Sequence, residues 1–203
     1  MGMMAELSGS DPKEDLHRYL RVAREALLWK LEGTSEYDAR RPLTGTGTNL
    51  LGLVKHVGTI ASEYFGSVFG RPFDESLSWA EEGAEANADM WATAEESRQQ
   101  ILDLYQRIWE HADATISALR LDAPGRVPWW GKRGEVTLHR ILIHVLAEIN
   151  RHAGHADIVR EMIDGTVGFR EGNDNLPTVD EARWTAYRNR LEQVAREVGT
   201  PSG

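Results

Sequence analysis

Four long segments of this chain repeat their apolar residues with the 3.6-residue period of an α-helix, and this pattern constrains the fold most. The four segments cover about residues 11–33, 48–69, 93–119 and 137–164. The first begins at Asp11, which has the character of an N-cap and is followed by Pro12 at the first helical position. No strand-like alternation of any length is present. The pattern predicts an all-α fold, an antiparallel four-helix bundle.

Long connections and a tail complete the chain. Residues 70–92 form an acidic connection, whose run from Glu81 to Asp89 is interpreted as a solvated loop. After a linker rich in Gly, Asn and Pro, residues 178–198 predict one more capped helix. We therefore expect a bundle domain over residues 11–168, and a linker and C-terminal helix packed on the bundle over residues 169–203.

Composition excludes several classes of protein. The 203 residues are 41% hydrophobic and 27% charged, as in a soluble globular protein. Acids outnumber bases 32 to 23, which argues against a general nucleic-acid binder. The chain has no cysteine, so disulfides, thiolate zinc sites and a protein thiol nucleophile are excluded, and any thiol chemistry needs an external thiol. No apolar run approaches the roughly 20 residues of a membrane span, and the N-terminal segment is too polar for a secretory signal. We expect a cytoplasmic protein.

Potential metal ligands concentrate in the stretch HVLAEINRHAGHAD of the fourth helix. His144, Glu148, His152 and His155 share a sector about 80° wide at 100° per residue. Glu148 and His152 are four residues apart, so both can reach one divalent ion from the same helix face. A third ligand must come from another element. The best candidate is His56 in LVKHVGTI, because it borders the apolar stripe of the second helix.

Each of these residues also has an ordinary structural interpretation. A histidine beside an apolar stripe, such as His56, is often a hydrogen-bonded structural residue. Glu148 has the spacing for a surface ion pair with Arg151. His144 and His155 are equally compatible with hydrogen bonding outside a metal site or with full solvation. The clustering of these residues favours the metal site.

The motifs together resemble a known superfamily. TNLLGLVKHVGTIASEYFGSVFGRPF, DMWATAEES and VPWWGKRGEVTLHRILIHVLAEINRHAGHADIVREMIDG resemble the DinB-like (YfiT-like) superfamily. The resemblance is greatest to the actinobacterial branch related to mycothiol-dependent maleylpyruvate isomerase, and it extends from the first helix to Gly165. It implies a DinB-type four-helix bundle with long inter-helix loops that holds zinc or nickel through His56, Glu148 and His152. A glutamate at the second position favours the mycothiol-related branch.

The function that the resemblance implies is thiol chemistry. We expect a metal-dependent enzyme that uses a low-molecular-weight thiol such as mycothiol in S-transfer or isomerisation, with the thiol activated as a metal-bound thiolate. The expected partners are this thiol and an electrophilic acceptor. His155 or His144 is the candidate proton shuttle, and Arg151 and Trp130 are candidates for shaping the substrate pocket. For Trp130, ordinary packing is the alternative.

Other functions remain open at this stage. A metal-dependent hydrolase that activates water needs the same three ligands and one vacant position. A non-enzymatic, stress-related metal-binding bundle requires a fourth ligand, which His144 or His155 can supply, and binding of no metal at all is a further alternative. An exposed apolar face on the tail helix is compatible with a homodimer. The sequence leaves open the thiol, the acceptor, the reaction type and the metal.

Overall fold

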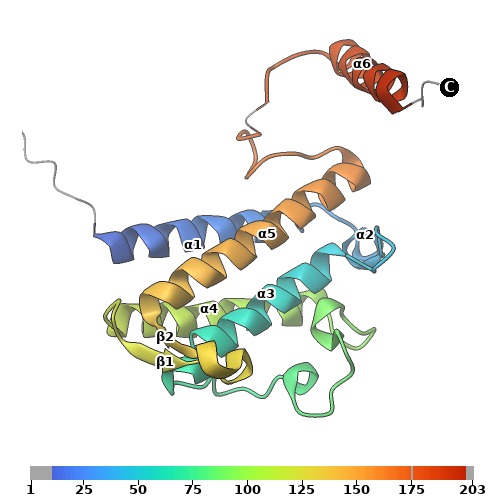
Figure 1. Ribbon diagram of the computed structural model, residues 1–203. Coiled ribbons are helices and arrows are strands. Elements are labelled where there is room, and N and C mark those ends of the chain that lie inside the picture. Colours follow the sequence, from blue (N-terminus) through green and yellow to red (C-terminus); the bar gives the residue numbers. More distant parts are fainter. Residues whose placement is uncertain (1–10, 175, 200–203) are drawn as a thin grey trace, which may run out of the picture.

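The structure is a computed structural model that describes residues 11–174 and 176–199. The polar segment tested for a secretory signal therefore lies mostly outside the described residues. Four long helices form a bundle, which confirms the expected all-α fold (Figure 1). They are α1 (Pro12–Trp29), α3 (Leu50–Tyr64), α4 (Arg98–Ala118) and α5 (Leu138–Asp164). A short helix, α2 (Glu36–Arg40), precedes α3, and α6 (Glu181–Gly199) follows the bundle.

The helix ends follow the local chemistry of the sequence. The Asp11 carboxylate accepts a hydrogen bond from the Lys13 amide at the start of α1, as predicted. Asn49 caps α3 in the same way. α5 begins at the Thr137 cap and ends at Gly165, whose φ of 78° is the left-handed conformation of a C-terminal cap. These caps fix the ends of the two helices that carry the candidate ligands, α3 and α5.

One core joins the four helices. α5 packs against both α1 and α3, and α3 packs against α4. Fully buried aliphatic side chains from all four helices meet in the interior, among them Leu20, Leu27, Leu53, Val57, Ile108, Ile116, Leu142 and Ile149. Side chains join α1 and α4: Lys13 donates to the carbonyl oxygen of Ser117, and the Asp113 carboxylate lies 2.7 Å from His17 Nε2 and accepts two hydrogen bonds from Arg24. The seam between α1 and α4 is therefore bridged by polar side chains.

The predicted absence of strands is wrong at one place. β1 (Pro124–Arg126) pairs antiparallel with β2 (Glu135–Thr137), directly before α5. Three-residue strands are too short for an alternating pattern to be visible in the sequence. The hairpin loop is a 3₁₀ segment, η4 (Pro128–Arg133), in which Gly131 adopts a φ of 56°. This loop holds Trp130 beside the start of α5.

The third long helix begins later than predicted. Its cap is Ser97, which forms a capping box with Gln100, although Thr93 and Glu96 have the same spacing in the sequence. The Glu96 carboxylate accepts a hydrogen bond from the Thr93 amide, and it accepts another, 2.8 Å long, from the buried ammonium group of Lys55. Glu96 therefore stabilises the turn before α4 and not the helix itself.

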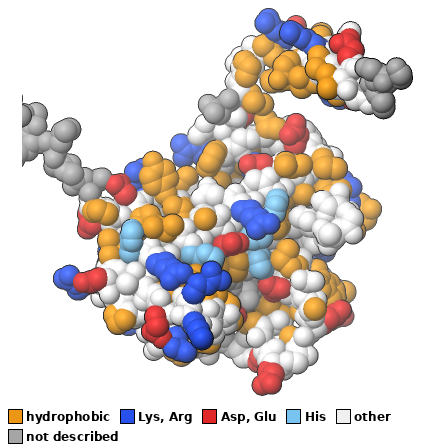
Figure 2. Space-filling model, in the orientation of Figure 1, with side chains coloured by type: hydrophobic (Ala, Val, Ile, Leu, Met, Phe, Trp, Pro, Cys, Tyr) orange, Lys and Arg blue, Asp and Glu red, His pale blue; other side chains and the backbone are white. Residues whose placement is uncertain are grey.

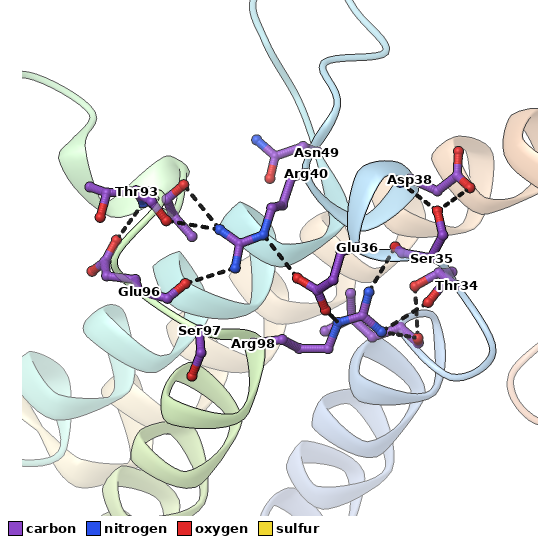
Figure 3. Close-up of polar contacts among 12 residues, drawn as sticks. Thr34, Ser35, Glu36, Asp38, Arg40, Asn49, Thr93, Glu96, Ser97 and Arg98 are labelled. Carbon is purple, nitrogen blue, oxygen red and sulfur yellow. Dashed lines mark hydrogen bonds and ion pairs between the residues drawn. The ribbon is translucent and has the colours of Figure 1, made fainter.

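Two arginines attach this turn to α2. Arg40 donates to the carbonyl oxygens of Thr93 and Glu96, and Arg98 donates to those of Thr34 and Ser35 (Figure 3). Both guanidinium groups also contact the Glu36 carboxylate. This network holds the end of the long acidic connection against the bundle.

The C-terminal helix is separate from the bundle. Figure 1 shows α6 beyond the C-terminal end of α5, joined to it by the linker. α6 contains no buried residue. That this helix packs on the bundle therefore stays a prediction. Among those residues, no helix is long and apolar enough to span a membrane.

Candidate metal centre

The candidate ligands lie on one side of the bundle, formed by α3 and α5, which we call the α3–α5 face. The two helices run antiparallel: the ring of His56 lies beside that of His152, and Tyr64 lies beside His144. Figure 2 shows this side of the molecule, where histidine side chains gather together with cationic and acidic ones. The packing of α3 against α5 therefore includes polar side chains.

His56 is held by a carboxylate from the long acidic connection. The 3₁₀ segment η3 (Ala88–Met90) brings Asp89 to α3, and Asp89 Oδ2 lies 2.6 Å from His56 Nδ1. The hydrogen bond from His56 lowers the pKa of Asp89, although burial alone would raise it. An ionised carboxylate only accepts, so Nδ1 of His56 donates this hydrogen bond, and in the neutral imidazole Nε2 is then the atom that can bind a metal. The interpretation of this acidic run as solvated is therefore wrong for Asp89.

His152 is the central residue of the face. Its ring centroid is 4.7 Å from that of His56, and its Nε2 atom is 3.7 Å from Glu148 Oε2, which is too long for a hydrogen bond. Its Nδ1 atom is buried without a hydrogen-bond partner among the described residues. Burial, followed by the charge of His56, lowers the pKa of His152 to about 4. The imidazole is therefore neutral at physiological pH, and this is the form that binds metals.

The structure places two of the predicted ligands, His56 and Glu148, next to the third, His152. His56 and Glu148 each approach His152, while the described residues contain no ready-made group of three or more His, Asp or Glu side chains that could hold an ion. In their neutral forms, two imidazoles form with a carboxylate a donor set that suits zinc or nickel. Donor atoms in a tetrahedral zinc site lie about 3.3 Å apart, so the 3.7 Å pair needs only a small adjustment. The donor chemistry fits a divalent ion, which His152 would bind through Nε2, the nitrogen beside Glu148.

Glu63 is a polar residue of this face that the sequence analysis missed. It is half-buried on α3, seven residues after His56 and thus on the same side of the helix. Burial and, to a smaller extent, the charge of Asp89 raise its pKa, whereas His56 lowers it. The i, i+7 spacing from His56 was the available signal in the sequence.

The remaining predicted residues occupy two different surroundings. His144 lies in an aromatic cluster, where its Nε2 atom is 3.1 Å from the Tyr64 hydroxyl and its ring is 4.8 Å from that of Trp130. His144 is two helical turns, about 12 Å, from His152. His155 and Arg151 are exposed beside His152, and the ring of His155 lies 5.6 Å from it. His155 is therefore close to the candidate ligands, and His144 lies at the far end of the face.

The fold and the polar α3–α5 face define a helical bundle of the DinB-like superfamily. Residues 15–165 match the family model described as Mycothiol-S-transferase, and the chain belongs to this family. The match runs from α1 to the end of α5 and leaves out α6. No curated protein is similar enough to the chain to match it.

Proposed function

We propose that the protein is a metal-dependent S-transferase that joins mycothiol, or a similar small thiol, through its sulfur to an electrophilic acceptor on the α3–α5 face. His56, Glu148 and His152 hold the ion. The family match supports the thiol and S-transfer. The observation that carries the proposal is the approach of the His56 ring and the Glu148 carboxylate to His152.

The protonation of His56 and His152 in the metal-free protein suits metal binding. Asp89 holds a proton of His56 on Nδ1, so that Nε2 is the atom that would bind the ion. His152 is already neutral, so binding does not require it to lose a proton. When bound, a divalent ion at this position favours the thiolate form of a coordinated thiol. Because the chain has no cysteine, no thiol of its own competes for the site.

Exposed groups beside the ligands complete the reaction. His155 accepts the proton that the thiol loses, and the sulfur lone pair then forms a bond to the electrophilic carbon. In a substitution the leaving group departs with its electron pair, and in an addition the acceptor carbanion takes the proton back from His155. Trp130 and Arg151 contact the acceptor at either side of Glu148.

Metal analysis and a transfer assay test this proposal. We expect protein purified without chelator to carry about one divalent ion, and His56→Ala and His152→Ala to lose the ion and at least 100-fold of the thiol-dependent transfer to a fluorogenic alkyl halide. The matched control is His139→Ala, an exposed histidine near the start of α5. Transfer that persists in the first two variants contradicts the proposal. Ester or amide hydrolysis without thiol identifies a hydrolase instead.

A further inference from the structure

The helix outside the family match, α6, has an apolar face that no other described element covers. At 100° per residue, five large side chains of α6 fall in a sector about 80° wide, which we call the α6 stripe. The stripe consists of Trp184, Tyr187, Leu191, Val194 and Val198. Tyr187, Leu191 and Val194 are 51–53% exposed, and Val198 is 81% exposed. A stripe of this width normally packs against a partner.

The surface of the bundle carries a groove of comparable length. It lies between α1 and α4 and has a volume of about 620 Å³, and we call it the α1–α4 groove. Its apolar side chains are Leu28 and Leu102, which are half-buried, and Leu31, Tyr105 and Trp109, which are buried in its floor. The α4 side of the groove extends from Arg98 to Asp113, about 22 Å at 1.5 Å per residue. The α6 stripe spans about 21 Å by the same measure. The stripe therefore matches the α4 side of the groove in length, whereas the α1 side comprises only residues 24–33.

The charges of the two surfaces are complementary. The rim of the groove carries Glu25, Glu32, Asp103 and Glu110, while Arg24 is already paired with Asp113 through two hydrogen bonds. On α6, three arginines border the stripe: Arg183 and Arg190 on one side and Arg188 on the other. An acidic rim facing a basic border favours association and fixes its orientation.

We propose that a second copy of this chain docks its α6 stripe in the α1–α4 groove, and that the exchange is reciprocal. In the structure α6 extends away from its own bundle, which is the geometry of an arm available to a neighbour (Figure 1). Mutual exchange of identical elements closes a symmetric dimer and covers both stripes. The groove is formed by α1 and α4, so this assembly is independent of the proposed chemistry on α3 and α5.

The oligomeric state of the full chain tests the proposal. We expect light scattering after gel filtration to give a dimer at micromolar concentration. Leu191→Glu in the stripe and Leu102→Glu in the groove should each weaken the dimer at least tenfold. Asn189→Glu is the matched control, because Asn189 lies on the opposite side of α6. Circular dichroism confirms that the variants fold. Asp103→Lys, an exposed change on the rim, should weaken the dimer several-fold without touching the core.

Mixing the two glutamate variants identifies the contact itself. A pair made of Leu191→Glu and Leu102→Glu chains retains one intact stripe and one intact groove, so association should partly return on mixing. A dimer that survives Leu102→Glu and Asp103→Lys shows that the α6 helices pair with each other, and overturns the proposal. A monomeric wild type overturns it as well, and protection of α6 from hydrogen exchange in that monomer places the helix in the groove of its own chain.

Discussion

The two C-terminal helices, α5 and α6, have the same kind of sequence pattern but differ in how much of their apolar side is buried. Both repeat apolar residues at helical spacing, and both are helices in the structure. α5 buries its apolar side completely, with Leu142, Val145 and Ile149 at 0% exposure. α6 buries none of its residues. The difference shows that helical periodicity identifies a helix and its apolar face but does not identify what covers that face.

The polar residues of the two helices differ in the same way. α5 places His152 and Glu148 on the seam with α3, where the side chain of His152 is only 11% exposed. The charged residues of α6 are all in solvent. Keeping polar groups in a seam lowers stability unless they are paired or bind a ligand, so their presence on α5 points to function. The exposed apolar stripe on α6 points to association instead.

The largest expected effect separates buried from exposed positions of the same residue type. Ile149→Ala in α5 should lower the free energy of unfolding by about 2–5 kcal/mol, because it leaves a cavity in the core. Ile158→Ala, in the same helix but 62% exposed, should change it by less than about 0.5 kcal/mol. Leu191→Ala in α6 should match Ile158→Ala at concentrations where the protein is monomeric. Urea denaturation measures all three. Equal losses at Ile149 and Leu191 would remove the distinction between the helices.

A smaller effect, on metal affinity, tests whether the candidate ligands on α3 and α5 depend on Asp89 of the acidic connection. Asp89→Asn keeps the size of the side chain but cannot hold the His56 proton as a carboxylate does. We expect the affinity for zinc or nickel to fall about 10–100-fold, as for other carboxylates that orient ligating histidines. Calorimetric titration of metal into the metal-free protein measures this. Glu85→Gln, an exposed change in the same connection, is the control. An unchanged affinity in Asp89→Asn would show that the pair is only structural.

Much of the fold could be predicted because its signals are local. The Asp11 cap, the apolar period of the long helices and the Gly165 cap depend on neighbours a few residues away. The start of α4 was misplaced because two capping signals compete, and the contact that decides between them, Lys55 to Glu96, spans 41 residues. The three-residue strands carry no periodic signal.

In the candidate site, too, the local features could be predicted and the long-range contacts could not. The spacing of Glu148 and His152 on one helix predicted their shared side, and the structure confirms that His56 lies beside His152. Their role as metal ligands stays a prediction. Asp89 was missed because its contact with His56 joins positions 33 residues apart, and an acidic run gives no sign of which carboxylate turns inward. The surroundings of His144 could not be predicted either, because its hydrogen bond to Tyr64 is visible only in the tertiary structure.

The smallest expected effect concerns Glu63, a half-buried charge of a kind that α6 lacks. Burial and the charge of Asp89 raise its pKa, so the folded state binds this proton more tightly than the unfolded state. The ionised side chain therefore lowers stability above the folded pKa, and this penalty disappears as the pH falls below the unfolded value near 4.5. In metal-free protein, Glu63→Gln should raise the free energy of unfolding at pH 7 by about 0.5 kcal/mol or less, with no gain at pH 4. Glu95→Gln, at an exposed position, should have no such pH-dependent gain. Denaturation curves at both pH values measure the difference, and a loss of stability at pH 7 would mean that Glu63 has a stabilising partner on this face.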